Sequence, residues 1–243
     1  MRGFYLSSHF TPYVILFLER DGSTYLSSLL SSHPEVEAVY ERFAVLNQKE
    51  AGAAEQISWA RSFWTPAWIN RVKARGFKTK LVDVLDVPAF QSLMIEKKCH
   101  IIYMQRKNRI KAVISKINAK RLYDKSGYWN LYTEKDRVPL TYFDPHEVDA
   151  LLQEREMLEK ELESFVSGLS LPTLKITYED LMAQRDPTLR KIFEFLHISQ
   201  KDVESKTLKH TSDNLQDVIE NFSELKSHYQ NSPYFEMFGE GSH

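Results

Sequence analysis

The chain has 243 residues, of which 42% are hydrophobic and 27% are charged, and its formal net charge is −1. This is the composition of a compact globular protein, so it excludes fibrous, coiled-coil and disordered classes. The near-neutral charge argues against a protein that coats nucleic acid, which needs a basic excess over one face. A single cysteine, Cys99, excludes an intramolecular disulfide.

The apolar run "YVILFL" near the N-terminus is far shorter than the roughly 20 residues that span a bilayer. We therefore expect no membrane span and a cytoplasmic location. The length suits one large α/β domain over residues 1–243, with its core at about 13–238.

Apolar and amphipathic periodicity predicts strands and helices that alternate along the chain. In chain order we expect a strand at 13–19, a helix at 23–33, a short strand at 36–40, a helix at 50–73 broken or kinked at Pro66, a strand at 77–85, a strand at 100–105, a helix at 108–123, a long aromatic-rich loop or lid at 124–145, a helix at 147–169, a strand within 173–181, a helix at 187–196 and a helix at 214–229. This order predicts an α/β fold, a central and mostly parallel sheet flanked by helices. Ligands of such sheets bind outside the carboxyl ends of the strands.

The turn between the first strand and the first helix has the residues of an anion site. A helix N-terminus attracts phosphate through its unpaired N–H groups and its dipole. Gly22 lets the backbone approach closely, Ser23 and Thr24 add hydroxyl donors, and Arg20 adds a planar fork of donors. An ordinary strand-to-helix turn capped by serine or threonine is the alternative. The turn lacks the lysine of a Walker A loop, so the nucleoside-triphosphate interpretation is weak.

A second basic site follows the strand at 100–105. Ten lysines and arginines lie between Lys97 and Lys125, against one acid, Asp124. Arg106 and Lys107 stand where this strand ends, so a phosphate held between one of them and Ser115 fits the same sheet edge. Surface charge and a back-bonded helix serine are the alternative. Two anion sites at one edge indicate a nucleotide with a 5′ chain and a 3′ phosphate.

These residues resemble the sulfotransferases that use 3′-phosphoadenosine 5′-phosphosulfate (PAPS). Arg20-Asp21-Gly22-Ser23-Thr24-Tyr25 is similar to their 5′-phosphosulfate loop, and "IIYMQRKNRIKAVISK" to their 3′-phosphate strand and helix. "LKITYEDL" is similar to the strand that usually follows, and "LKHTSDNLQDVIENFSELK" to the tail of bacterial nodulation-type members. The likeness covers about residues 13 to 238. It implies a P-loop-like sulfotransferase fold, PAPS as donor, the bisphosphate PAP as product, and no metal.

The resemblance also implies roles for individual residues. Residues Arg20 to Tyr25 would hold the 5′ side of the donor, and Asp21, where the family usually has serine, should point away from the ligand or cap the helix. Arg106 or Lys107, with Arg106 favoured as the bidentate partner, would hold the 3′-phosphate together with Ser115. Four residues near the C-terminus could approach the nucleotide: Lys209, Thr211, Ser212 and Asn214.

The candidate base is Glu41, which follows the second predicted strand in "VYERF"; some bacterial members of the family place a catalytic glutamate in a similar sequence. A glutamate bonded to Arg42 is the alternative interpretation. His33 is a second candidate base, although a histidine before proline at a helix end is also typical of a capping role.

Where cytosolic animal relatives have Lys-Thr-His-Leu, with histidine as base, this chain has Lys78-Thr79-Lys80-Leu81. The lysine in place of histidine favours Glu41 as base. Lys80 or Lys78 could then stabilise the group that is transferred. The alternative is that both are ordinary lysines on the face of a strand.

The sequence thus predicts an enzyme that moves a sulfuryl group from PAPS to a hydroxyl of a carbohydrate, a glycolipid or a small natural product. A P-loop-type kinase or nucleotide hydrolase and a non-catalytic relative that binds an anionic partner are the alternatives. The acceptor would be the partner; the sequence predicts neither nucleic acid nor a membrane as one.

Overall fold

The structure is a computed structural model and describes residues 10–65, 71–127, 129, 139–205 and 214–239. Its centre is a sheet of five parallel strands in the order β2-β3-β1-β4-β5. The strands are β1 (Thr11–Leu16), β2 (Val36–Val39), β3 (Ala74–Thr79), β4 (His100–Gln105) and β5 (Thr173–Thr177). The predicted α/β class with a parallel central sheet is therefore confirmed.

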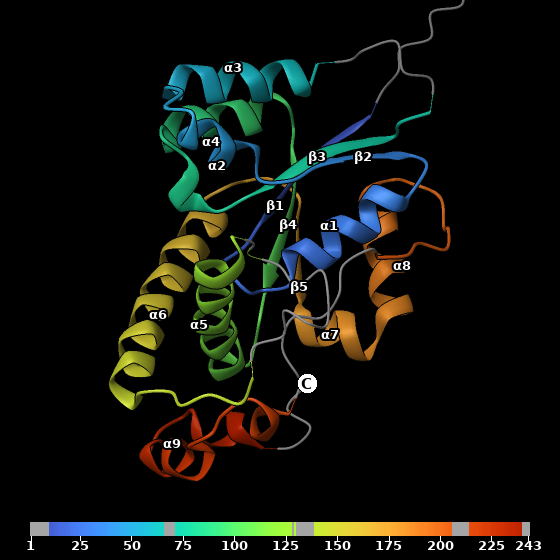
Figure 1. Ribbon diagram of the computed structural model, residues 1–243. Coiled ribbons are helices and arrows are strands. Elements are labelled where there is room, and N and C mark those ends of the chain that lie inside the picture. Colours follow the sequence, from blue (N-terminus) through green and yellow to red (C-terminus); the bar gives the residue numbers. More distant parts are fainter. Residues whose placement is uncertain (1–9, 66–70, 128, 130–138, 206–213, 240–243) are drawn as a thin grey trace, which may run out of the picture.

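Helices cover both faces of this sheet (Figure 1). They are α1 (Ser23–Ser32), α2 (Arg42–Gln48), α3 (Ala53–Phe63), α4 (Val87–Glu96), α5 (Arg109–Ser126), α6 (Pro145–Ser167), α7 (Tyr178–Ala183), α8 (Arg185–Phe195) and α9 (Phe222–His228). Apolar side chains of α2, α3, α4 and α6 pack on one face, and those of α1, α7 and α8 on the other. A third cluster joins α5 and α6 to α9 and to the 3₁₀ turns at Leu215–Asp217 and Phe235–Phe238.

The strand β1 lies at the middle of the sheet, and its side chains alternate between the two cores. Val14 and Leu16 join one core, while Tyr13 and Ile15 join the other, and all four are buried. Burial on both faces explains why β1 is a continuous apolar run rather than an alternating pattern. On α1, Leu26, Leu29 and Leu30 are fully buried, and each contributes about 1.5–3 kcal/mol to stability. The first strand-to-helix turn is thus held by buried anchors on both sides.

Several boundaries differ from the sequence prediction. The helix expected at 50–73 is α3, which ends at Phe63, and the strand expected at 77–85 is β3, which starts at Ala74 and stops at Thr79. The chain turns there because Leu81–Asp83 form a 3₁₀ helix. The sequence prediction missed α4, which is capped by the Asp86 side chain and has a proline in its first turn.

The C-terminal helix expected at 214–229 is split into the turn Leu215–Asp217 and α9. The chain between them also bonds to a distant segment. Thr141 N–H donates to the carbonyl of Val218, and Glu220 N–H donates to the carbonyl of Thr141. The Asn221 side chain bonds both the N–H and the carbonyl of Phe143. These long-range bonds outweigh the local helical pattern.

Aromatic residues of the helix expected at 50–73 belong to the core or pack against it. Trp64, which ends the helix, is buried against Phe77, and Trp59 stacks on Phe63. Trp68, and residues 128 and 130–138 of the expected lid, lie outside the described residues. Among the described helices, none is long and apolar enough to cross a membrane; the cytoplasmic location stays a prediction.

Glu35, just before β2, ties three segments together. Its carboxylate pairs with Lys73 Nζ at 2.6 Å and accepts the Ser199 N–H at 2.8 Å. The hydrogen bond from Lys73 lowers the pKa of Glu35 to about 2. A carboxyl whose folded pKa is depressed stabilises the fold above its unfolded pKa and loses that contribution as the pH falls through the folded pKa.

We therefore expect Glu35→Gln to lower the free energy of unfolding by about 1 kcal/mol at pH 7, because solvent screens the half-exposed Lys73 partner. The difference in free energy of unfolding between wild type and variant should become smaller as the pH falls from 4.5 to 2. Urea denaturation at pH 7 and at pH 3 measures it. An equal gap at both values would contradict the assignment.

Candidate active site

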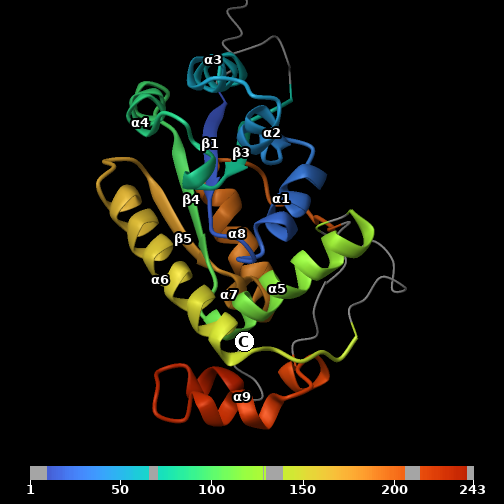
Figure 2. The same ribbon diagram turned by 60° about the vertical axis from the view of Figure 1, so that its left-hand side comes forward.

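The two turns singled out in the sequence meet at one edge of the sheet, because β1 and β4 pair in parallel. Leu16 near the end of β1 lies opposite Tyr103 near the end of β4. The turn at residues 17–22 (the first turn) then leads into α1, and the turn at 106–108 (the second turn) leads into α5. Figure 2 shows both turns at the lower edge of the sheet, above the C-terminal segment.

Backbone shape opens the N-terminus of α1 to a ligand. Gly22 precedes the helix with φ 85°, and no side chain caps the helix. A β-carbon at Gly22 would lie 2.4 Å from the ring of Tyr178, so glycine is required both by conformation and by space. The first N–H groups of a helix have no intrahelical partner, so those of Ser23, Thr24 and Tyr25 are available to an anion.

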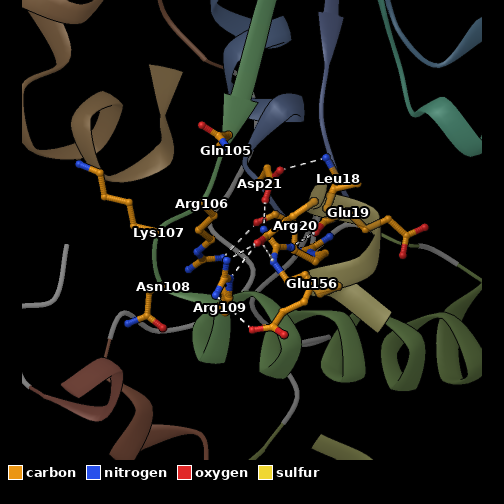
Figure 3. Close-up of polar contacts among 12 residues, drawn as sticks. Leu18, Glu19, Arg20, Asp21, Gln105, Arg106, Lys107, Asn108, Arg109 and Glu156 are labelled. Carbon is orange, nitrogen blue, oxygen red and sulfur yellow. Dashed lines mark hydrogen bonds and ion pairs between the residues drawn. The ribbon is translucent and has the colours of Figure 1, made fainter. Parts of the chain in front are cut away.

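Arg20 and Arg106 lie close together near this helix end (Figure 3), and Arg20 bonds a serine of α5. Arg20 Nε donates to Ser115 Oγ at 2.9 Å, and Arg106 Nη1 donates to the carbonyl of Arg20 at 3.2 Å. Burial, and then the charge of Arg106, lower the pKa of Arg20 to about 10. Two partly buried like charges in one place favour an anion between them.

Arg106 has a free donor beside the first turn. Its Nε is a buried donor without a hydrogen-bond partner among the described residues, and its guanidinium lies 4.6 Å from the ring centre of Tyr178. Acidic residues pair with many of the other cations; for example, Arg109 pairs with Glu159 and Lys116 with Glu154.

Lys107, the alternative to Arg106, points away from Arg20 (Figure 3). It pairs with Asp180 at 3.2 Å and is exposed. The geometry therefore brings Arg106, and not Lys107, to Arg20 in the first turn, and Arg20 in turn bonds Ser115.

The residues Tyr178 and Glu179, at the start of α7, organise both turns. Tyr178 lies between Gly22 and Arg106. The buried Glu179 carboxylate accepts the N–H of Lys107 at 3.0 Å and that of Asn108 at 3.1 Å. Sequence reasoning placed these residues in a final strand; the signal that they begin a helix was the Thr177 hydroxyl, which caps α7 by accepting the Asp180 N–H.

A buried lysine links the first turn to the candidate base. Lys78 Nζ, on β3, donates to Thr24 Oγ1 at 2.8 Å and lies 2.8 Å from Glu41 Oε1. The Lys78 side chain is 2% exposed and that of Glu41 34%. Burial lowers the pKa of Lys78, and the charge of Glu41 opposes this. The described partner of Glu41 is thus Lys78 rather than Arg42.

Other predicted site residues lie elsewhere. Lys80 points to the acids Glu19, at 2.9 Å, and Asp83, at 3.6 Å. His33 ends α1, about 15 Å along the helix from the first turn. It is the C-cap residue of α1, because its backbone N–H donates to the carbonyl of Leu30. Its Nδ1 accepts the Glu35 N–H at 3.1 Å and its Nε2 bonds the carbonyl of Ser199 at 2.9 Å. Lys209, Thr211 and Ser212 lie outside the described residues.

Asp21 points away from the helix N-terminus. Its carboxylate accepts the Leu18 N–H at 2.9 Å and pairs with Arg155 of α6. Burial raises the pKa of Asp21 to about 6, and the charge of Arg155 opposes the rise. The negative charge therefore faces the protein interior rather than the anion site. No signal in the sequence indicated Arg155 as its partner.

A cavity of about 230 Å³ lies beside the first turn, between the chain after β3 and the helices α5 and α6. Leu81, Val113 and Leu158 contribute apolar wall, and Glu19, Lys80 and Lys116 contribute charge. No group of three or more potential metal ligands occurs within the described part of the chain.

Known proteins resemble this chain in sequence and in fold. The family model described as a sulfotransferase domain matches residues 11–235. Nodulation protein H of Rhizobium tropici is 20% identical over 237 residues, which are 93% of this chain and 92% of that protein. The crystal structure of a sulfotransferase from Alicyclobacillus acidocaldarius covers 94% of both chains, with a TM-score of 0.52 and 12% identity.

A mouse sulfotransferase complexed with PAP matches at a TM-score of 0.46 and 17% identity. The match covers 81% of this chain and 64% of the mouse chain, so this chain spans less than two thirds of that structure.

The shape of the first turn yields a stability prediction. Gly22→Ala should lower the free energy of unfolding by about 2–4 kcal/mol, because the left-handed conformation costs about 1–2 kcal/mol and the new methyl group overlaps Tyr178. Gly127→Ala is the matched control: its φ is 75° but its surroundings are open, so only the conformational cost should appear. Chemical denaturation compares the two, and equal losses would contradict the close approach of Tyr178.

Proposed function

Since the chain belongs to the sulfotransferase domain family, we propose that it transfers a sulfuryl group from PAPS to a hydroxyl of a carbohydrate, a glycolipid or a small natural product. The observation that carries the donor assignment is the meeting of an uncapped helix N-terminus with a second basic site at one sheet edge. A donor with anionic groups at its 5′ and 3′ ends matches two such sites.

The residues present fit this donor. The N–H groups at the start of α1, with Arg20, would hold its 5′ side, and Ser115 with Arg106 would hold the 3′-phosphate. The buried Nε of Arg106, which has no described hydrogen-bond partner, provides a donor for that phosphate. When bound, PAPS supplies the sulfuryl group and leaves as PAP.

The chain's own groups would then catalyse the transfer. Glu41, exposed enough to meet an acceptor, would accept the proton of the acceptor hydroxyl. Lys78 lies between Glu41 and Thr24, so its ammonium would stabilise charge that develops on the bridging oxygen. In-line transfer of this kind needs positioning and electrostatic stabilisation more than covalent help from the protein.

The acceptor would reach the donor through the cavity beside the first turn. Its lining includes Glu19, the residue before Arg20, and Lys80 and Leu81, which follow Lys78 by two and three residues. Its mixed lining suits a molecule with both an apolar part and a polar part.

The donor assignment predicts a specific effect at Arg106. Arg106→Ala should weaken binding of adenosine 3′,5′-bisphosphate by about 10- to 100-fold, because it removes a charge-assisted hydrogen bond, and change binding of adenosine 5′-phosphate less than threefold. Calorimetric titration of both ligands measures this. Lys107→Ala is the matched control and should bind both like wild type, because Lys107 points to Asp180.

The same titration of the wild-type protein with ATP and magnesium separates the alternatives. A preference for ATP with magnesium would favour a kinase or nucleotide hydrolase. Binding of none of these nucleotides would remove the donor assignment.

The base assignment predicts a separation between binding and turnover. Glu41→Gln should bind the bisphosphate within threefold of wild type and lose about 10²- to 10⁴-fold in turnover, because the amide cannot accept the proton. Turnover is the release of PAP from PAPS with a phenol, a long-chain alcohol or a chitin oligosaccharide, whichever the wild type uses. Glu55→Gln, an exposed change on α3, should keep wild-type turnover. Wild-type rates in Glu41→Gln would remove Glu41 as base.

A further inference from the structure

Arg155 grips the first turn on both sides of Arg20. From α6, its Nη1 donates to the carbonyl of Glu19 at 3.1 Å, and its Nη2 bonds the carboxylate of Asp21. Both contacts are made inside the protein, because Arg155 is only 7% exposed. One guanidinium therefore fixes the residues immediately before and after Arg20.

Arg20 needs such support because its backbone is in the left-handed region, with φ 69°. Residues other than glycine adopt this region at a cost, and they stay there when their neighbours hold them. Asp21 closes the turn further, since its N–H donates to the carbonyl of Leu18 and its carboxylate accepts the Leu18 N–H. This backbone path directs the Arg20 side chain to Ser115.

Arg155 is itself held in place. Its Nε donates to Glu159 at 2.9 Å, and the other oxygen of Glu159 accepts from Arg109 of α5 at 2.8 Å. The fork of Arg155 is thus fixed between a carboxylate of its own helix and the first turn. In this orientation it bonds the turn rather than the site where a donor would lie.

We propose that Arg155 is a positioning residue for the 5′ end of the donor, acting through Arg20 and coupled to Asp21. The inference rests on the proposed function, because it takes the first turn as the site of the 5′-phosphate. It assigns two tasks to one guanidinium: it holds the left-handed turn, and it neutralises the buried carboxylate that stands where the family loop usually has serine.

The affinity gained by the 5′-phosphate measures this role. It is the ratio of the dissociation constants of adenosine 3′-phosphate and adenosine 3′,5′-bisphosphate, determined by calorimetric titration. Arg155→Met should reduce this ratio at least tenfold, because the turn loses both bonds from the guanidinium and the buried Asp21 carboxyl loses its charged partner. Affinity for adenosine 3′-phosphate should change less than threefold. A purely structural role would weaken both ligands alike.

Coupling to Asp21 is tested in a serine background. With Asp21→Ser present, Arg155→Met should reduce the ratio at least threefold less than it does in the wild-type background, because no buried carboxylate is left unpaired. If Arg155→Met does not fold, Arg155→Lys replaces it in both backgrounds, since lysine cannot bond both sides of the turn. Arg61→Met, which breaks the exposed pair with Glu96, is the matched control and should leave the ratio unchanged.

An unchanged ratio in the Arg155 variants, or equal losses in the two backgrounds, would overturn the proposal while leaving the donor assignment intact. A wild-type protein that binds no bisphosphate would overturn the proposed function, and the inference with it.

Discussion

The parallel pairing of β1 with β4 is the constraint on which the rest of the site depends. Parallel strands end at the same edge, so the turns that follow them meet even though they are more than 80 residues apart in the sequence. The buried anchors of β1 and α1 fix the first turn, and Glu179 fixes the second. The arginines Arg20 and Arg106 are thereby held side by side by the fold, against their mutual repulsion.

The cationic side chains at this edge fall into two groups: those that pair with a carboxylate of the chain and those that do not. Arg155 and Arg109 are bonded to acids of the chain and act as structure. Arg20 and Arg106 instead bond a hydroxyl and a carbonyl, which leave their charges uncompensated. Lys78 is intermediate, because its partner Glu41 is the group proposed to change protonation. The proposed donor would supply the missing negative charge.

The fold class could be predicted from sequence because a doubly covered parallel sheet gives continuous apolar runs separated by amphipathic helices. The placement of Arg20, Gly22 and Ser115 at one edge also follows from this order, although their roles stay predictions. Which lysine reaches the turn depended on where β3 ends: it stops at Thr79, so Lys80 leaves the sheet and Lys78 reaches Thr24. Tyr178 and Arg155 belong to helices distant in the sequence, and their contacts depend on packing that no local pattern encodes.

The N-termini of α1 and α5, which both lie at this edge, differ in what their N–H groups bond. The Glu179 carboxylate bonds the N–H groups that lead into α5, so this end already holds an anion of the chain, whereas α1 begins without a cap. A ligand would thus meet main-chain donors at one turn and side-chain donors at the other. Recognition by main chain depends on the path of the backbone and is indifferent to the side chains that do not face the ligand. Position 21 could therefore diverge in sequence provided that the loop keeps its shape, while Arg106, in its proposed role at the 3′-phosphate, would have no such freedom.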